Sequence, residues 1–143
     1  MARTILCIED EQDTGDLLQS ILEREGYVVV RAADGRQATS LIGTMQPPML
    51  ILLDIVVHYA NGFELLAAFR QHHEWKHVPI VMVSADYYEP DIQRALSEGA
   101  TAYVEKSPGL QDLMRTVKQV LSSLASEGSV ASAPAKPQNG RTP

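Results

Sequence analysis

Residues 49–54 read MLILLD, five apolar residues followed by a carboxylate. A run of this length fits a β-strand, and because each of the five positions is apolar it suits a parallel sheet covered on both faces. Four further runs of strand length, rich in apolar residues, occur at residues 4–8, 27–30, 80–83 and 102–104. The sequence therefore predicts five strands of one parallel sheet.

Helical patterns fill the intervals between these runs. Their apolar residues recur three and four positions apart, which places them on one face of a helix. Gly26 and Gly99 follow two of the patterns as helix stops, Asp34 is a predicted N-cap, and Pro90 suits a first helical turn. The apolar residues are Leu17, Leu18, Ile21 and Leu22; Ala38, Leu41, Ile42 and Met45; Leu65, Leu66 and Phe69; Ile92, Ala95 and Leu96; and Leu110, Leu113, Val117, Val120, Leu121 and Leu124.

Five strand–helix units in succession predict an α/β fold with right-handed crossovers. They fit a flavodoxin-like, doubly wound five-stranded parallel sheet with the strand order 2-1-3-4-5. We expect one domain over residues 1–126. Residues 127–143 contain three prolines and two glycines, with Val130 as the one large apolar residue, and are expected to form a flexible tail or linker.

The composition excludes several classes of protein. The 143 residues include 18 acids and 12 bases, and the net charge of −6 argues against a nucleic-acid partner. No apolar run approaches the ~18 residues that cross a bilayer, and the run at residues 4–8 is too short for the apolar core of a signal peptide. The single cysteine, Cys7, excludes an internal disulfide and a cysteine-based zinc cluster. We expect a cytoplasmic protein in which Cys7 is a small buried apolar residue.

Polar residues follow the predicted strands where ligands bind in open α/β sheets, beyond the carboxyl ends. Glu9 and Asp10 follow the first strand, Asp54 the third and Ser84 the fourth, and Lys106 lies just past the fifth. The first and third strands flank the point where the strand order reverses. These side chains are therefore expected to converge at one edge of the sheet.

The charges of this group indicate its chemistry. Three clustered carboxylates repel one another and need a cation, and Mg²⁺ prefers a few carboxylates together with water and phosphate oxygens. With Mg²⁺ and Lys106 the site is nearly neutral and can accept a phosphoryl group. An aspartate that faces such a group, here Asp54, is a nucleophile that forms an acyl phosphate. Ser84 and Lys106 can bind the remaining phosphoryl oxygens.

Four segments then carry a family resemblance: ILCIEDE (5–11), LLDIVVHYANGFEL (52–65), VPIVMVSA (78–85) and GATAYVEKSPGLQDL (99–113). In this order and spacing they resemble the signature segments of the response-regulator receiver domain of two-component signal transduction. The resemblance covers roughly residues 3–125. It implies that Asp54 is the phosphoacceptor, that Asp10 is a direct metal ligand and that Glu9 holds the metal through water. It also implies that the backbone carbonyl of Val56 binds Mg²⁺.

The same resemblance implies that Ser84 and Lys106 are the family's hydroxyl and lysine, and that Tyr103 is the switch aromatic. The sequence departs from the family pattern at four places. Glu9 stands where aspartate is commoner, His58 and Ser107 each replace a proline, and Asn61-Gly62 replaces Asp-Gly.

The resemblance also implies partners. The phosphohistidine donor would be a sensor histidine kinase or a histidine phosphotransfer protein in a phosphorelay. A downstream protein would read the face formed by the fourth helix, fifth strand and fifth helix, and the same face is a candidate homodimer contact. Such a domain is not an enzyme beyond its own phosphorylation and autodephosphorylation. No nucleic acid and no membrane is expected as a partner.

The sequence also bears on three other functions. A flavin- or nucleotide-binding domain needs a Gly/Ser/Thr-rich loop after the first strand, where this chain reads EDEQD. A dehalogenase-like phosphatase needs a second aspartate at the position of Val56. A pseudo-receiver, a protein-interaction module that is not phosphorylated, stays open as the alternative. His72, His73 and His77 with Glu74 are interpreted as a solvated loop rather than a metal site, because Pro79 and a predicted helix end interrupt their spacing.

Overall fold

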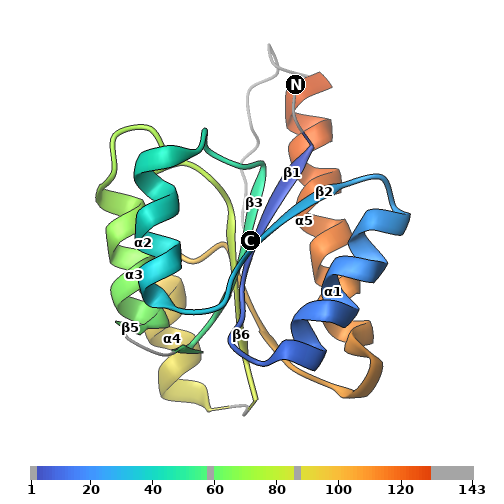
Figure 1. Cartoon of the computed structure of the whole chain (residues 1–143), viewed down its shortest axis with the longest axis horizontal. Coiled ribbons are helices and arrows are strands. Elements are labelled where there is room, and N and C mark those ends of the chain that lie inside the picture. Colours follow the sequence, from blue (N-terminus) through green and yellow to red (C-terminus); the bar gives the residue numbers. More distant parts are fainter. Residues whose placement is uncertain (1–2, 58–59, 86–87, 130–143) are drawn as a thin grey trace.

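The computed structural model describes residues 3–57, 60–85 and 88–129, with the backbone alone for Ala60 and residues 125–129 (Figure 1). The five strands of the main sheet alternate along it with five helices. The strands are β1 (Thr4–Ile8), β2 (Val28–Ala32), β3 (Leu50–Asp54), β6 (Ile80–Ser84) and β7 (Ala102–Glu105). The helices are α1 (Gln12–Arg24), α2 (Gly35–Thr44), α3 (Gly62–Gln71), α4 (Glu89–Ser97) and α5 (Gln111–Ser129), and a 3-10 turn, η1 (Pro108–Leu110), precedes α5.

The five strands form one sheet in the order β2-β1-β3-β6-β7, and every neighbouring pair is parallel. Counted among themselves in chain order, these strands follow the predicted order 2-1-3-4-5. The α/β fold class and the doubly wound topology are therefore confirmed. The labels β4 (Val56–Val57) and β5 (Ala60–Asn61) belong to a separate two-stranded antiparallel ladder in the loop after β3.

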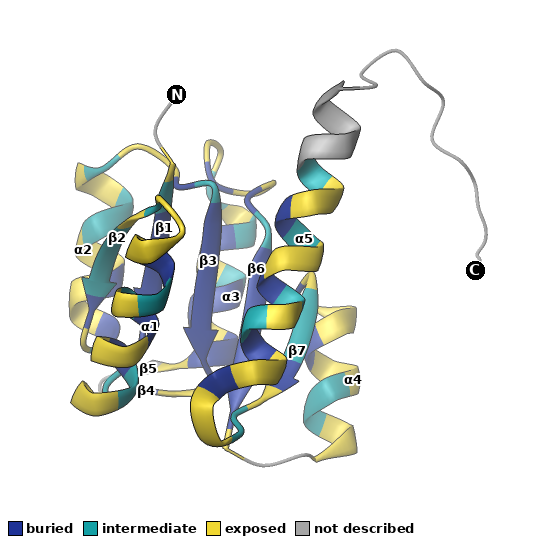
Figure 2. Ribbon diagram, turned by 90° about the vertical axis from the view of Figure 1, so that its right-hand side faces the viewer, coloured by how far each residue is buried: buried dark blue, intermediate teal, exposed yellow. Residues whose placement is uncertain are grey.

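Helices cover both faces of the sheet, with α2, α3 and α4 on one side and α1 and α5 on the other (Figure 1). The dark central strands of Figure 2 show how completely β3 and β6 are buried between these layers. Successive strand residues point to opposite faces, so β1 sends Leu6 and Ile8 into the core beneath α2 and α3. Its residues Ile5 and Cys7 enter the core beneath α1 and α5. This two-sided burial explains why the strands read as continuous apolar runs.

The predicted helix signals hold at both ends of the helices. The side chain of Asp34 accepts a hydrogen bond from the backbone N–H of Gln37 at 2.9 Å and caps α2. Gly26 follows α1 with a φ of +94°, in the left-handed region where glycine is favoured. The chain can therefore turn sharply from α1 into β2.

Arg31 extends β2 beyond the predicted apolar run at residues 27–30. Its guanidinium donates to Asp16 Oδ1 of α1 at 2.6 Å, so a charged residue is accommodated at the edge of the sheet. The antiparallel ladder of β4 and β5 was not predicted, because two residues per strand leave no periodic signal. Helix α5 runs three residues past the predicted boundary at 126, and residues 130–143 of the predicted tail lie outside the described residues.

The amino ends of β6 and β7 are joined by Arg70 of α3. Its guanidinium donates to the carbonyl oxygens of Gly99 at 2.8 Å, Val78 at 2.6 Å and Lys76 at 3.1 Å. Burial lowers the pKa of Arg70. One cation thus holds the two loops that lead into these strands.

Trp75 lies in the loop between α3 and β6 and is fully buried. Its ring stacks on Phe69 with centroids 5.4 Å apart and planes 12° apart. Within the described residues its indole Nε1 has no hydrogen-bond partner. The described part of the chain also has no helix whose length and apolarity would let it pass through a membrane.

Candidate functional site

The carboxyl ends of β1, β3, β6 and β7 bring the predicted residues into one cavity of about 310 Å³. Glu9 and Asp10 directly follow β1, Asp54 ends β3 and Ser84 ends β6, while Lys106 follows β7. The cavity is lined by Glu9, Asp10, Glu11, Asp54, Val56, Ser84, Ala85 and Lys106. The convergence predicted from strand order is therefore present.

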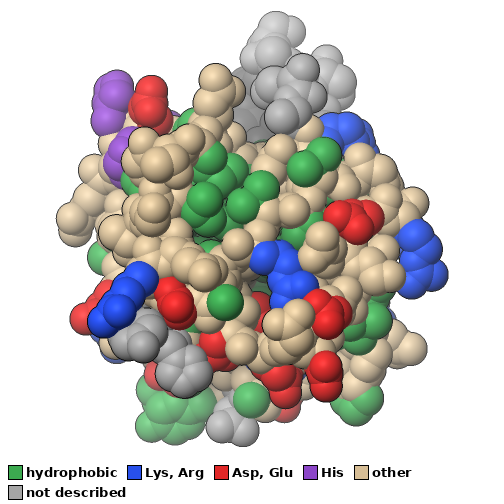
Figure 3. Space-filling model, in the orientation of Figure 1, with side chains coloured by type: hydrophobic (Ala, Val, Ile, Leu, Met, Phe, Trp, Pro, Cys, Tyr) green, Lys and Arg blue, Asp and Glu red, His purple; other side chains and the backbone are tan. Residues whose placement is uncertain are grey.

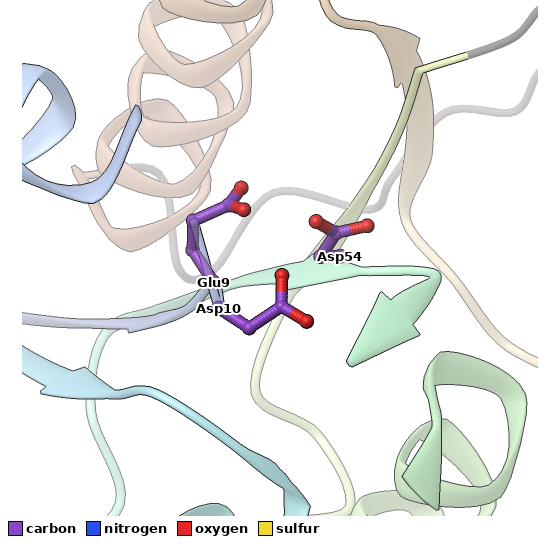
Figure 4. A group of neighbouring side chains, drawn as sticks. All are labelled: Glu9, Asp10 and Asp54. Atoms are coloured by element: carbon purple, nitrogen blue, oxygen red, sulfur yellow. The ribbon is translucent and has the colours of Figure 1, made fainter. Parts of the chain in front are cut away.

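Three carboxylates meet in this cavity. One carboxylate oxygen from each of Glu9, Asp10 and Asp54 lies within 4.8 Å of the other two (Figure 4). Glu9 and Asp54 are buried, and Asp10 is half-buried. Oxygen ligands at this spacing, with one side open to water, suit a small divalent cation.

Lys106 joins two of these carboxylates. Its Nζ lies 2.8 Å from Asp54 Oδ2 and 2.9 Å from Glu9 Oε1, and the lysine side chain is only 19% exposed. Burial by itself lowers the pKa of Lys106, but hydrogen bonds to Asp54 and Glu9 outweigh it, and the pKa is raised. The lysine is therefore a fixed positive charge at the centre of the site.

Glu9 behaves differently from an exposed glutamate. Burial, together with the charge of Asp54, raises the pKa of Glu9 to about 7, although Lys106 acts in the opposite direction. The carboxylate also accepts a hydrogen bond from the backbone N–H of Glu11 at 3.1 Å. Without a cation, the site therefore holds a proton at Glu9 more readily than a free glutamate would.

Asp54 is held by both of its oxygens. Oδ1 accepts from the backbone N–H of Val56 at 3.0 Å, and Oδ2 accepts from Lys106. The backbone of Lys106 is itself fixed, because its N–H donates to the carbonyl of Ser84 at 2.7 Å. The carboxylate is thus oriented before any ligand arrives.

Ser84 and Tyr103 lie on adjacent strands. In the register of β6 and β7, Ser84 pairs with Glu105 and Met82 pairs with Tyr103. Because residues two apart share a face of a sheet, Ser84 and Tyr103 lie on the same side. Tyr103 is half-buried and packs against the core beneath α2, α3 and α4.

Acidic side chains gather on the outer surface beside the site. They occupy the lower part of the face in Figure 3, where β1 leads into α1 in Figure 1. The exposed acids at this junction include Glu11 and Asp13. Their field favours the approach of a cation to the cavity.

Gly62 was missed as a contributor to this site. Its N–H donates to the carbonyl of Ile55 at 2.6 Å, and a Cβ at this position would lie 2.6 Å from the carbonyl oxygen of Asp54. The residue pair Asn61-Gly62 was noted only as a departure from the family's Asp-Gly, although a glycine at that place signals a close approach of two backbones. Ala85, which also lines the cavity, could have been found from its place directly after Ser84.

Two other predictions concern residues outside the cavity. Among the described residues, the group whose spacing suits a metal ion consists of Glu9, Asp10 and Asp54, and His72, His73 and His77 are not part of it. Cys7 is buried as predicted, and burial raises the pKa of its thiol to about 12. Such a thiol is not reactive at neutral pH.

No peptide bond among the described residues is cis, including that between Lys106 and Ser107.

Comparisons with known proteins agree on one family. Residues 5–118 match the family described as the response regulator receiver domain. A protein of Leptolyngbya boryana, described as an uncharacterised 14.6 kDa protein in the sodA1 3′ region, is 34% identical over 115 residues, which cover 80% of this chain and 87% of that protein.

Solved structures agree as well. A phosphorylated cyanobacterial phytochrome response regulator, RcpA, is 26% identical with a TM-score of 0.75, covering 94% of this chain and 98% of that chain. The Mn²⁺-bound response regulator Rcp1 is also 26% identical, with a TM-score of 0.73, covering 84% of this chain and 92% of that chain.

Proposed function

The chain belongs to the response regulator receiver family, and on this premise we propose that Asp54 accepts a phosphoryl group from a phosphohistidine donor with the help of Mg²⁺. The observation that carries the proposal is the position of Asp54 between an acidic pair and a lysine. One carboxylate oxygen of Asp54 lies within 4.8 Å of oxygens of Glu9 and Asp10, and its Oδ2 contacts Lys106. The site thus has places for both the cation and the phosphoryl charge.

The residues present fit a divalent cation. Asp10 and Asp54, with Glu9 acting through water and the backbone carbonyl of Val56, would hold Mg²⁺, which supplies charge neutralisation for the incoming phosphoryl group. The solved relative with bound Mn²⁺ supports the same class of ligand. Of the three carboxylates Glu9, Asp10 and Asp54, that of Asp10 is the least buried and the most accessible to a hydrated ion.

In the transfer, an oxygen of Asp54 bonds to phosphorus while the P–N bond of the phosphohistidine breaks. Lys106 already contacts Asp54 and would neutralise a phosphoryl oxygen as charge shifts toward the site. Ser84 lines the same cavity, and its hydroxyl would donate a hydrogen bond to another phosphoryl oxygen. The protein contributes position and charge, since its carboxylate is already oriented by Val56 and Lys106.

The output follows from Ser84 and Tyr103. Movement of the Ser84 hydroxyl toward a phosphoryl group would open space on the side of the sheet where Tyr103 lies. The ring of Tyr103 could then turn inward and alter the face of α4, β7 and α5. We propose that a downstream protein partner, or a second copy of the chain, reads that face in the cytoplasm. The upstream partner would be a sensor histidine kinase or a histidine phosphotransfer protein.

Intact mass measurement after incubation with acetyl phosphate and Mg²⁺ tests the proposal. We expect a gain of one phosphoryl group that disappears with EDTA and in Asp54→Asn. The matched control is Asp112→Asn, because Asp112 is an exposed aspartate of α5 that forms an ion pair with Arg115 and does not line the cavity. Absence of a mass gain in the wild-type protein would favour the pseudo-receiver alternative, and labelling of Asp54→Asn would refute the assignment of Asp54.

A further inference from the structure

The backbone of Asp54 is packed directly against the start of α3. A Cβ at Gly62 would lie 2.6 Å from the carbonyl oxygen of Asp54 and 2.7 Å from the Cα of Ile55, so no side chain fits between them. The N–H of Gly62 donates to the carbonyl of Ile55 at 2.6 Å. A displacement of the Asp54 backbone must therefore be passed to Gly62.

The first turn of α3 is rigid. Asn61 Oδ1 accepts from the N–H of Glu64 at 2.8 Å, and Glu64 Oε1 accepts from the N–H of Asn61 at 3.0 Å, which forms a reciprocal capping box. Phe63 lies between these residues, and its side chain is buried. The ring of Phe63 consequently moves with the start of α3 rather than independently of it.

Arg94 of α4 lies over this ring. Its guanidinium carbon is 4.1 Å from the centroid of Phe63, which is the geometry of a cation–π contact. The Nε of Arg94 also donates to Glu98 Oε2 at 2.9 Å, which orients the guanidinium from one side. The two helices lie on the same side of the sheet (Figure 1).

Helix α4 is attached less firmly than α3. Ala95 is the single buried residue among the nine of α4, all of which are described, whereas α3 buries five of its ten residues. The N-cap residue of α4, Tyr88, gives no side-chain hydrogen bond to the helix. Arg94 directly precedes Ala95, the buried residue of α4. Its contact with Phe63 therefore holds α4 next to the place where this helix is anchored in the core.

We propose that the stacking of Arg94 on Phe63 couples the backbone of Asp54 to the position of α4. This route runs through Gly62 and the first turn of α3, and it is separate from the one through Ser84 and Tyr103. The proposal rests on the proposed function, because the displacement would come from a phosphoryl group on Asp54. A ligand shifts such an element only if it interacts differently with its two positions.

The test uses beryllofluoride with Mg²⁺ as a stable phosphoryl mimic. Fluorine NMR detects the bound probe, and amide NMR spectra follow α4 and β7 separately. We expect Arg94→Gln to bind the probe while the shift changes across residues 89–97 fall to about half or less of the wild-type response. Changes across residues 102–105 should stay as in the wild-type protein. Arg94 is an exposed residue, so this variant should fold.

Two further variants sharpen the test. Glu98→Gln removes the negative charge that pairs with Arg94 but keeps the ring contact, so its α4 response should match the wild-type protein. Phe63→Leu should reduce the α4 response as Arg94→Gln does, and the double variant should be no worse than either single one, because both remove the same contact.

The outcomes are distinguishable. Absence of bound probe in the wild-type protein would overturn the proposed function and this coupling with it. Bound probe with a full α4 response in Arg94→Gln and in Phe63→Leu would overturn the coupling alone.

Discussion

Lys106 and Arg70 are both partly buried cations, yet they lie at opposite edges of the sheet and have opposite partners. Lys106, at the carboxyl edge, contacts the carboxylates of Glu9 and Asp54, and its pKa is raised. Arg70, at the amino edge, donates to three backbone carbonyls, and burial lowers its pKa. The charged partners of Lys106 can bind a further ligand, such as a cation, and therefore suit a chemical site. The carbonyl partners of Arg70 are neutral backbone groups, so that arginine serves to hold two loops together.

The largest expected effect is on the rate of phosphorylation and follows from the loss of Lys106. Lys106→Met should slow phosphorylation of Asp54 by acetyl phosphate about 100-fold, because one positive charge facing the phosphoryl oxygens is lost. The rate of mass gain at saturating Mg²⁺ measures it. Lys118→Met, at a lysine on α5 away from the cavity, is the control and should keep the wild-type rate. A wild-type rate in Lys106→Met would show that the lysine only balances the carboxylates.

The loss of Arg70 is expected to affect stability rather than phosphorylation. Arg70→Met should lower the free energy of unfolding by about 3 kcal/mol, because three carbonyls lose a charged donor and two loops lose their common contact. Urea denaturation followed by circular dichroism measures the loss. The folded fraction of this variant should be phosphorylated at the wild-type rate.

Arg115→Met is the matched control for Arg70. Arg115 is an exposed arginine that contacts Asp112 alone among the ion pairs of the described residues, and its loss should cost no more than about 0.5 kcal/mol. If the two variants were equally stable, Arg70 would have to be reclassified as a surface charge.

A smaller effect is a pH dependence of the free energy of unfolding, which arises at the carboxyl edge through Glu9. The pKa of Glu9 is raised to about 7 in the folded protein, above its ordinary value of 4.5, so the folded state binds a proton more tightly than the unfolded chain does. Stability from this group is complete below about pH 4.5 and is lost as the pH rises through about 7, by on the order of 2 kcal/mol. Denaturation in EDTA between pH 5 and 8 should reveal the loss, and Glu9→Gln should remove it. A flat wild-type profile would contradict the raised pKa.

The smallest effect concerns the end of α5, which lies at the same end of the molecule as the amino ends of the strands (Figure 1). We propose that residues 1–126 form the working domain, so a chain that ends at Ser126 should keep its phosphorylation rate and lose no more than about 0.5 kcal/mol of stability. A loss as large as that of Arg70→Met would mean that the amino edge depends on the last residues as well.

Much of the fold could be predicted because it depends on local patterns. Continuous apolar runs reveal strands that are buried on both faces, and residues such as Asp34 and Gly26 mark helix ends through their own hydrogen bonds and backbone angles. The extension of β2 through Arg31 could not be predicted, since it depends on Asp16 of another element. The ladder of β4 and β5 is too short to leave a pattern.

The site divides in the same way. Strand order alone brings Glu9, Asp54 and Lys106 to one edge, so their convergence could be predicted. The contact of one lysine with both carboxylates, and the raised pKa of Glu9, depend on burial and side-chain direction across 97 positions of sequence. The packing of Gly62 on Asp54 likewise depends on how closely two backbones approach, which no residue pattern records.

Trp75 has a practical consequence. It is the chain's only tryptophan, and it is fully buried against Phe69 at the far end of α3 from Asn61 and Gly62. Its fluorescence should therefore be blue-shifted in the native protein and move to longer wavelength only when the core opens. Because Trp75 does not line the cavity, loading the cavity with a cation should leave the emission maximum in place. The molecule thus carries an optical reporter of unfolding that is insensitive to the occupancy of its own site.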